Sequence, residues 1–158
     1  MAFGTKYRVD FIDDRTSTYW RCDIQEDSYA GAVTELDASG DPLTIEWLAD
    51  GEDKFTVMKG SIATISCYQT IDFQLAEIFN SDPLTYKVII YRHTSFTSMP
   101  KYWIGYVDPS LWSEPYEKTP YVVNITAADG VGILKNIPYQ DSGSDYEDYR
   151  THIQILYD

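Results

Sequence analysis

The chain has 158 residues, a formal net charge of −13, 44% hydrophobic residues and 23% charged residues. This length and composition indicate one globular domain, or one domain and part of a second, and exclude a disordered chain. Its 12 Lys and Arg residues are scattered, so the chain lacks the clustered positive charge that specific nucleic-acid binding requires.

The distribution of apolar residues along the chain also indicates where in the cell the protein is made. No run of about 18 apolar residues occurs, so the sequence predicts no membrane-spanning helix and no membrane anchor. The first residues lack the apolar stretch of a signal peptide, which predicts synthesis in a cytoplasm. In that compartment we expect Cys22 and Cys67 to be buried free thiols, because each sits within an apolar alternation and disulfides are rare there.

Alternation of apolar and polar residues predicts β-strands along most of the chain, and the 14 Tyr and 4 Trp residues favour the same structure. The expected strands are 6–12 and 20–25 as a hairpin, then 43–47, 55–58, 61–68, 86–92 and 102–107. We expect a turn at 37–42 and a two-turn helix over 71–79, where apolar residues have near-helical spacing. These elements indicate a mainly β fold, a small antiparallel barrel or sandwich with one or two short helices.

The C-terminal segment has a different pattern. Ser144 and Glu147 form a capping box, and apolar residues then recur at helical spacing up to the last residue. The sequence therefore predicts a C-terminal helix, which continues into a further domain or is covered by a partner. The expected organisation is a β domain over 1–110, a crossing, strand and Asp-Gly turn over 111–135, and a linker and helix over 136–158.

Residues with catalytic or ligand-binding chemistry are few. Neither His93 nor His152 belongs to a nucleophile motif, and no zinc or phosphate-binding spacing occurs. The sequence therefore predicts a protein that is not an enzyme and holds no cofactor or metal. An acidic hydrolase is a further alternative, with Asp108 and Glu114 as the candidate carboxylates.

The four tryptophans raise the possibility of carbohydrate binding, because sugars stack on exposed indole rings. Trp20, Trp47 and Trp103 are in phase with the apolar positions of their strands, so we expect them in the core. Trp112 lies in a proline-flanked crossing and is the best candidate for an exposed or interface aromatic residue. A carbohydrate-binding β-sandwich module is the alternative function, with Trp112 or Tyr116 on the glycan.

Three short motifs in the second half of the chain resemble tail proteins of phages and prophages from Bacteroidetes-type bacteria. In that family a strand ends in W-x-G-[FY]-[IV]-x-P, a loop carries E-P-Y, and a strand ends in A-x-D-G-L-x-x-L-K. The matching residues here are Tyr102-Trp103-Ile104-Gly105-Tyr106-Val107-Asp108-Pro109, Glu114-Pro115-Tyr116 and Ala127-Ala128-Asp129-Gly130-Val131-Gly132-Ile133-Leu134-Lys135. Val131 replaces the usual leucine, and Lys59-Gly60-Ser61 also resembles the family.

The resemblance implies the N-terminal part of a baseplate-hub or tail-tip protein, located in the virion tail. It implies a β-barrel of the tail-tube type in a trimeric or hexameric homo-oligomer ring around the tail channel. Its implied partners are the tube, distal tail and tape-measure proteins. No catalytic residue carries over. The motif or interface residues are Trp103, Gly105, Pro109, Trp112, Pro115, Tyr116, Asp129 and Gly130.

The Asp129-Gly130 pair also has a purely local interpretation. It is expected to form a tight turn that caps a following helix, with Asp129 accepting backbone N–H bonds and Gly130 at a positive φ.

Overall fold

The computed structural model describes residues 2–48, 60–70, 75–79, 84–95, 97–109, 117–130, 140–141 and 144–145. The main sheet contains β1 (Phe3–Asp13), β2 (Thr18–Asp27), β3 (Thr34–Glu35), β4 (Ala38–Leu48), β5 (Gly60–Gln69), β6 (Tyr86–His93), β7 (Lys101–Val107) and β8 (Tyr121–Asp129). The remaining elements are the short helix α1 (Leu75–Phe79) and the strands β9 (Gln140–Asp141) and β10 (Ser144–Asp145). The expectation of a mainly β protein is confirmed. No helix in the described segments is long and apolar enough to cross a membrane.

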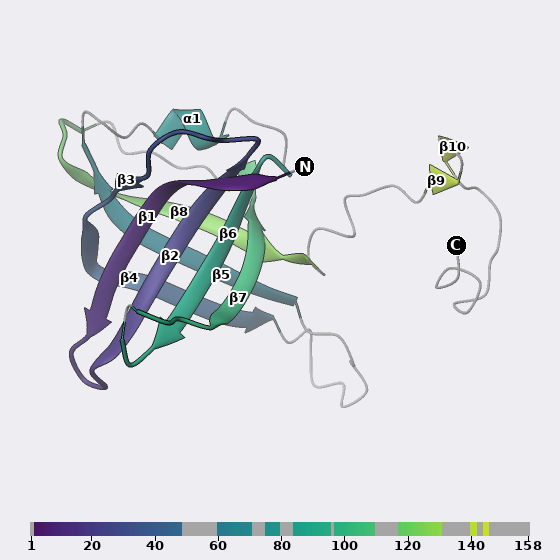
Figure 1. The fold of residues 1–158 in the computed structure, drawn as a ribbon. Helices are drawn as coiled ribbons and strands as arrows, with labels where there is room; N and C mark the ends of the chain where they lie inside the picture. Colours follow the sequence, from purple (N-terminus) through teal and green to yellow (C-terminus); the bar gives the residue numbers. More distant parts are fainter. Residues whose placement is uncertain are drawn as a thin grey trace.

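The eight strands follow the order β3-β1-β2-β6-β7-β8-β5-β4. Neighbouring strands are antiparallel except β1 and β3, which are parallel. The sheet curls, so that β1, β2, β6 and β7 lie in front of β8, β5 and β4 (Figure 1). One core fills the space between the two halves, because each strand directs alternate side chains inward. Its largest fully buried side chains are Val9, Cys22, Ile24, Ile65, Cys67, Ile78, Val88, Ile90, Val123 and Ile125.

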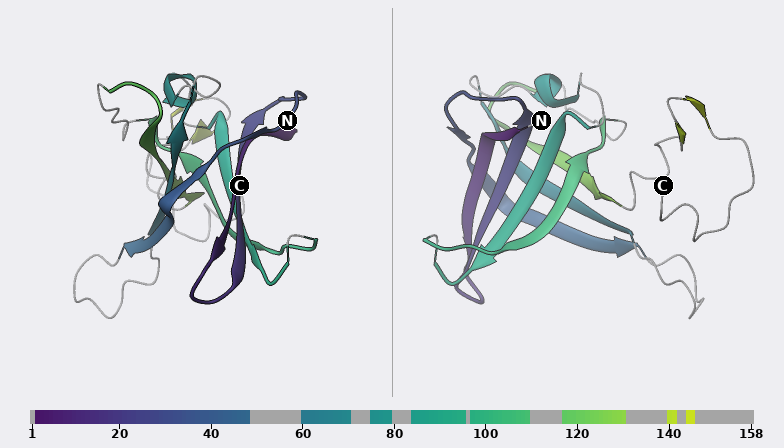
Figure 2. Two further views of the ribbon diagram at one scale, coloured as in Figure 1. Left: turned by 90° about the vertical axis from the view of Figure 1, so that its left-hand side faces the viewer. Right: turned by 45° about the vertical axis from the view of Figure 1, so that its right-hand side comes forward.

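The two edge strands of this sheet, β3 and β4, are consecutive in the chain. Only Leu36 and Asp37 separate them. The Leu36 N–H donates to the Arg8 carbonyl at 2.7 Å, and the Tyr68 N–H donates to the Asp37 carbonyl at 2.9 Å. This link therefore ties both edges together at one end of the sheet. At the other end β1 and β4 diverge (Figure 2, left), and the ladder of strands does not close. The finer expectation of a closed barrel or a two-sheet sandwich is not confirmed.

The hairpin predicted near the N-terminus is confirmed as β1 and β2, and its outer face carries paired charges. Arg8 lies opposite Asp23, with Nε 2.7 Å from the carboxylate, and Arg21 lies opposite Asp10 at 2.6 Å. Asp23 is only 5% exposed. Because a buried carboxylate without a partner is costly, the Arg8 contact makes this position tenable. The strands predicted at 61–68, 86–92 and 102–107 are confirmed as β5, β6 and β7.

Several expectations were wrong. The segment 37–42 is not a turn, because β4 already begins at Ala38, and a register irregularity between Ala38 and Leu43 accommodates the polar residues there. Pro42 is tolerated because β4 is an edge strand. Trp47 is 62% exposed and not in the core. It has the expected inward phase, opposite the buried Ser61, but it lies toward the end of β4 where the sheet does not close.

Other expectations are shortened or fall outside the described residues. The helix predicted over 71–79 is observed only as α1, since 71–74 are outside the described part. The expected C-terminal helix is not confirmed: Ser144–Asp145 pairs with Gln140–Asp141 as a strand, and 146–158 lies outside the described residues. The strand expected at 55–58 also lies outside them.

The prediction of two buried free cysteines is confirmed. Cys22 and Cys67 are both fully buried in the core. Burial raises the pKa of the Cys67 thiol to about 12 and raises that of Cys22 well above its ordinary value. Both thiols are therefore neutral at physiological pH and unreactive, because the thiolate is the nucleophilic form.

Candidate functional site

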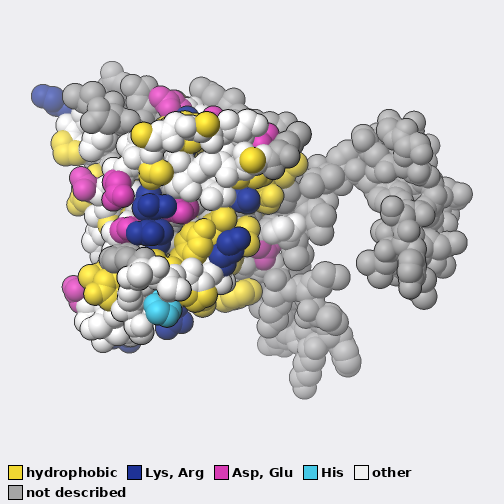
Figure 3. Space-filling view, viewed as in Figure 1, with side chains coloured by type: hydrophobic (Ala, Val, Ile, Leu, Met, Phe, Trp, Pro, Cys, Tyr) yellow, Lys and Arg dark blue, Asp and Glu magenta, His cyan; other side chains and the backbone are white. Residues whose placement is uncertain are grey.

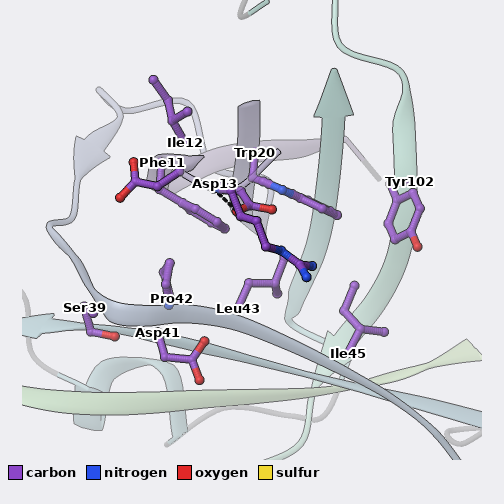
Figure 4. Close-up of a pocket in the computed structure, with 13 residues that line it drawn as sticks. Phe11, Ile12, Asp13, Trp20, Ser39, Asp41, Pro42, Leu43, Ile45 and Tyr102 are labelled. Atoms are coloured by element: carbon purple, nitrogen blue, oxygen red, sulfur yellow. Dashed lines mark hydrogen bonds between the residues drawn. The ribbon is translucent and has the colours of Figure 1, made fainter. Parts of the chain in front are cut away.

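A pocket of about 750 Å³ opens where β1 and β4 diverge. Its walls come from the ends of β1 and β2, the first part of β4 and the start of β7. In Figure 4, Phe11 and Trp20 face Leu43 and Pro42 across the space, and Tyr102 and Ile45 lie at one side. Pockets of this size are typical of ligand binding sites in proteins.

An aromatic row forms one wall of the pocket. Phe11 on β1, Trp20 on β2 and Arg92 on β6 lie directly opposite one another across three neighbouring strands. The Phe11 and Trp20 rings are parallel, with centroids 6.4 Å apart, and the Arg92 guanidinium lies 5.3 Å from the Trp20 centroid. Tyr102 approaches Trp20 edge-on at 5.4 Å. These contacts fix the indole ring, which is flanked by Phe11 on one side and Arg92 on the other.

Tyr102 reaches this pocket because of a β-bulge. Ile90 pairs with Trp103 and Tyr91 pairs with Lys101, so Tyr102 is an extra residue on β7. A bulge of this kind breaks the alternation of side chains along a strand. As a result Tyr102, 49% exposed, lies in the pocket wall while its neighbour Trp103 is buried in the core.

The mouth of the pocket is acidic. Asp13, Asp14 and Asp41 line it together with one cation, Arg15. Asp13 is already engaged, since its carboxylate accepts the Arg15 backbone N–H at 2.9 Å and the Thr16 hydroxyl at 2.6 Å. These bonds, the Thr16 hydroxyl foremost, lower the pKa of Asp13. Asp14 and Asp41 are exposed, so their carboxylates face solvent at the mouth.

The W-x-G and D-G motifs meet inside the protein. The Trp103 indole N–H donates to the Ser61 hydroxyl at 2.9 Å, and this hydroxyl donates to the Asp129 carboxylate at 2.7 Å. The Ser61 backbone N–H donates to the same carboxylate oxygen at 2.7 Å. A Cβ on Gly105 would overlap the Trp103 ring and the Ala128 carbonyl oxygen, so only glycine fits there. These motif residues therefore join β5, β7 and β8 through one hydrogen-bonded cluster.

The local interpretation of the Asp129-Gly130 pair is only partly right. Asp129 does accept a backbone N–H, but that of Ser61 on a neighbouring strand. Gly130 does not have a positive φ and has helical geometry, and the residues that follow it lie outside the described part. Pro109 lies two residues after the end of β7 and has 3₁₀ geometry. The other motif and candidate residues, Trp112, Glu114, Pro115 and Tyr116, lie outside the described residues.

A second charged cluster surrounds Lys6 at the other end of β1. Its ammonium lies 3.1 Å from Glu26 and 3.7 Å from Glu77. It also lies 5.5 to 5.8 Å from the ring centroids of Tyr7, Tyr29 and Tyr86. Burial lowers the pKa of Lys6, but hydrogen bonds to Glu26 and Tyr86 outweigh it, and the pKa lies above its ordinary value. The two carboxylates and three aromatic rings of this cluster therefore already surround a cation of the protein itself, the Lys6 ammonium.

Sequence reasoning missed the pocket for identifiable reasons. The segment 37–42 was expected to be a turn, so Asp41 and Leu43 were not placed beside Phe11. Trp20 was expected in the core, and it packs only at its margin. No sequence signal marks the bulge that directs Tyr102. Two features of the sequence did point to the pocket lining. They are the apolar phase of Trp20 and the acidic turn after residue 12.

Comparison of the chain with models of protein families, with curated proteins and with solved structures finds no match. Among the described residues, no group of three or more His, Cys, Asp or Glu side chains is placed to hold a metal ion.

Proposed function

We propose that this chain is a structural subunit of a phage tail, a baseplate-hub or tail-tip domain that assembles as a ring around the tail channel. Copies of the chain contact one another through outer faces of the sheet, as a trimer or hexamer. Tube, distal tail and tape-measure proteins are its further partners, and the virion tail is its location. The family resemblance of the Trp103 and Asp129 motifs supports this role.

The observation that carries the proposal is a pair of exposed apolar side chains on the outside of the sheet. Tyr68 on β5 and Val122 on β8 lie directly opposite each other and are 37% and 42% exposed. Ile104, on the outer face of β7, is 44% exposed and lies opposite Ile89 of β6. Figure 3 shows hydrophobic side chains gathered over β6 and β7 on this face. Adjacent exposed apolar residues mark protein interfaces far more than single ones do.

The test is the mass of the purified protein in solution over a concentration series, by light scattering or native mass spectrometry. We expect a trimer or hexamer whose share of the total protein rises with concentration. Ile104→Thr and Val122→Thr should weaken it by at least about tenfold in dissociation constant, because interface apolar anchors typically contribute more than 1 kcal/mol. Val33→Thr is the matched control, since Val33 is 39% exposed and lies outside the strands.

Two results would contradict the ring subunit. One is a monomer at all concentrations, and the other is equal dissociation by Val33→Thr and by the two sheet variants. In either case the apolar residues on the outer faces would not be assembly contacts.

A carbohydrate-binding module is the second candidate, and one observation favours it. Tyr102 presents a half-exposed ring at a pocket that also carries carboxylates, the combination that sugar sites use. The measurement is a glycan screen with the wild type and Tyr102→Ala. Binding that the substitution abolishes would support this candidate.

A further inference from the structure

The pocket between β1 and β4 is bordered by two strand edges. From Val9 to Asp13, β1 pairs with β2 on one side and has no strand partner on the other among the described residues. In the same part of the structure β4 pairs with β5 alone. Backbone N–H and C=O groups along such edges are templates for a further strand.

The side chains around these edges have the pattern of a strand-binding site. Leu43 and Ile45 on β4 point inward toward the core, and Thr44 between them is exposed. Phe11 and Trp20 form the opposite wall (Figure 4). An added strand next to β4 would place every second side chain between these two walls, because side chains alternate along a strand.

Charge determines what kind of strand fits. Three aspartates and one arginine line the pocket, and the whole chain carries a formal net charge of −13. The cations nearby are Arg15 in the pocket lining and Arg92 beside the Trp20 ring, and three acids are exposed, Asp14 and Asp41 at the mouth and Glu46 on β4. Long-range attraction therefore favours a basic partner and disfavours an acidic one.

We propose that this pocket binds an extended segment of a partner protein in which apolar and basic residues alternate. The segment adds as a strand to the edge of β4 from Leu43 to Leu48, with its apolar side chains inward beside Leu43 and Ile45 and its Lys or Arg side chains on the outer face, where Thr44 and Glu46 are exposed. Pro42 has no N–H to offer, so pairing ends there. The pocket suits such a segment whether or not the chain belongs to a phage tail.

A sugar fits the pocket less well than a strand does. Stacking on a sugar needs an open aromatic face, and Phe11 and Arg92 flank the Trp20 ring from the two neighbouring strands. Of the aromatic rings in the pocket, that leaves Tyr102 as the most exposed. Backbone edges also have no role in sugar binding, whereas they account directly for strand addition.

The probe is a synthetic nine-residue peptide of alternating lysine and valine, titrated into the full chain by isothermal calorimetry. A peptide of the same composition, with the valines in one block, is the first control. Two further peptides carry backbone N-methyl groups on all valines or on all lysines. The alternating peptide should bind, the block peptide should not, and at least one N-methylated peptide should bind about tenfold more weakly, because each lost backbone hydrogen bond costs about 0.5 to 1.5 kcal/mol.

Variants of the chain test the charge contribution. Glu46→Gln should weaken the alternating peptide about threefold at low salt, the scale expected for one exposed charge pair with a Lys of the added strand. The difference should shrink at about 0.5 M salt, where exposed charges are screened. The control is Asp37→Asn, an exposed acid that lies outside both the pocket lining and the β4 edge from Leu43 to Leu48, and it should change the affinity less than about 1.5-fold.

Several results would overturn the proposal. One is no binding of the alternating peptide at concentrations up to about 1 mM, since a dissociation constant above that value is too weak for a specific site. Another is that the block peptide and both N-methylated peptides bind as tightly as the alternating peptide. Equal effects of Glu46→Gln and Asp37→Asn, or displacement of bound peptide by a glycan, would also count against it. None of these results depends on whether the protein forms a ring, so this proposal and the tail role fail separately.

Discussion

The inner face of the sheet is covered at one end and open at the other. Near the β3–β4 link, core side chains such as Val9, Cys22 and Ile65 are completely buried. Toward the other end Phe11 and Leu43 pack against the same core yet remain partly exposed. The alternation of residues is the same at both ends. The difference arises because the link between Glu35 and Ala38 brings the two sheet edges together at one end only.

Within this one layer of side chains, the covered end contributes to the stability of the fold and the open end is available for binding a partner. Full burial of an aliphatic side chain contributes about 1.5 to 3 kcal/mol, and partial burial proportionately less. The closed end therefore supplies most of the stability. The open end keeps apolar area accessible to a partner.

The sharpest test uses two residues that lie directly opposite each other. Ile65 is fully buried, and its partner Leu43 lines the pocket. We expect Ile65→Ala to lower the free energy of unfolding by about 4 kcal/mol and Leu43→Ala by about 1 kcal/mol, because a cavity forms only at the buried position. Chemical denaturation measures both. Equal losses would mean that the pocket end is as tightly packed as the core.

The second prediction concerns the close approach at Gly105. Gly105→Ala should destabilise by about 3 kcal/mol, because the added methyl group overlaps the Trp103 ring and the Ala128 carbonyl oxygen. Gly40→Ala is the control, since no atom lies within 4 Å of the position its Cβ would take. It should change stability by less than about 0.5 kcal/mol. A small effect at Gly105 would show that β7 and β8 can separate freely.

A third substitution removes the hydroxyl that joins the motif cluster. Ser61→Ala should cost about 2 kcal/mol, because it leaves the buried Trp103 N–H without its acceptor and removes a donor to Asp129. Ser66→Ala is the matched control. Ser66 lies on the outer face of the same strand as Ser61, and its hydroxyl donates to Asn124 of β8 in an exposed contact. We expect a change within about 0.5 kcal/mol there. Thermal unfolding of the two variants measures both losses, and equal losses would contradict the prediction.

The last prediction, with the smallest effect per pH unit, is a dependence on alkaline pH. Burial raises the pKa of Cys67 from its ordinary value of 9.0 to about 12. The thiol stays protonated in the folded chain and ionises above pH 9 in the unfolded chain, so its contribution is complete below pH 9 and is lost toward pH 12. Stability should fall by about 1.4 kcal/mol per pH unit on its account. Cys67→Ala should flatten the slope by that amount in denaturation series from pH 8 to 11, and an unchanged slope would contradict the prediction.

The strands were predictable because their alternation is local. Val9, Cys22 and Ile24 each occupy inward positions that periodicity alone identifies. The pocket was not predictable, because it depends on how edges separated in sequence meet. Trp47 shows the limit: its phase was read correctly, but exposure depends on whether another strand covers that end. Likewise, Trp103 and Asp129 were singled out by motif, whereas their connection through Ser61 depends on the tertiary fold.

The position of β8 has a consequence for how the protein is made. It lies between β7 and β5, and Ile62 pairs with Ala128 while Gln69 pairs with Tyr121. During synthesis β1 and β2 can pair early, because they are adjacent in sequence. The half of the sheet formed by β4 and β5 gains its connection to β7 only after residues 121–129 have left the ribosome. The sheet therefore becomes continuous only when β8 pairs with both of its neighbours, late in synthesis.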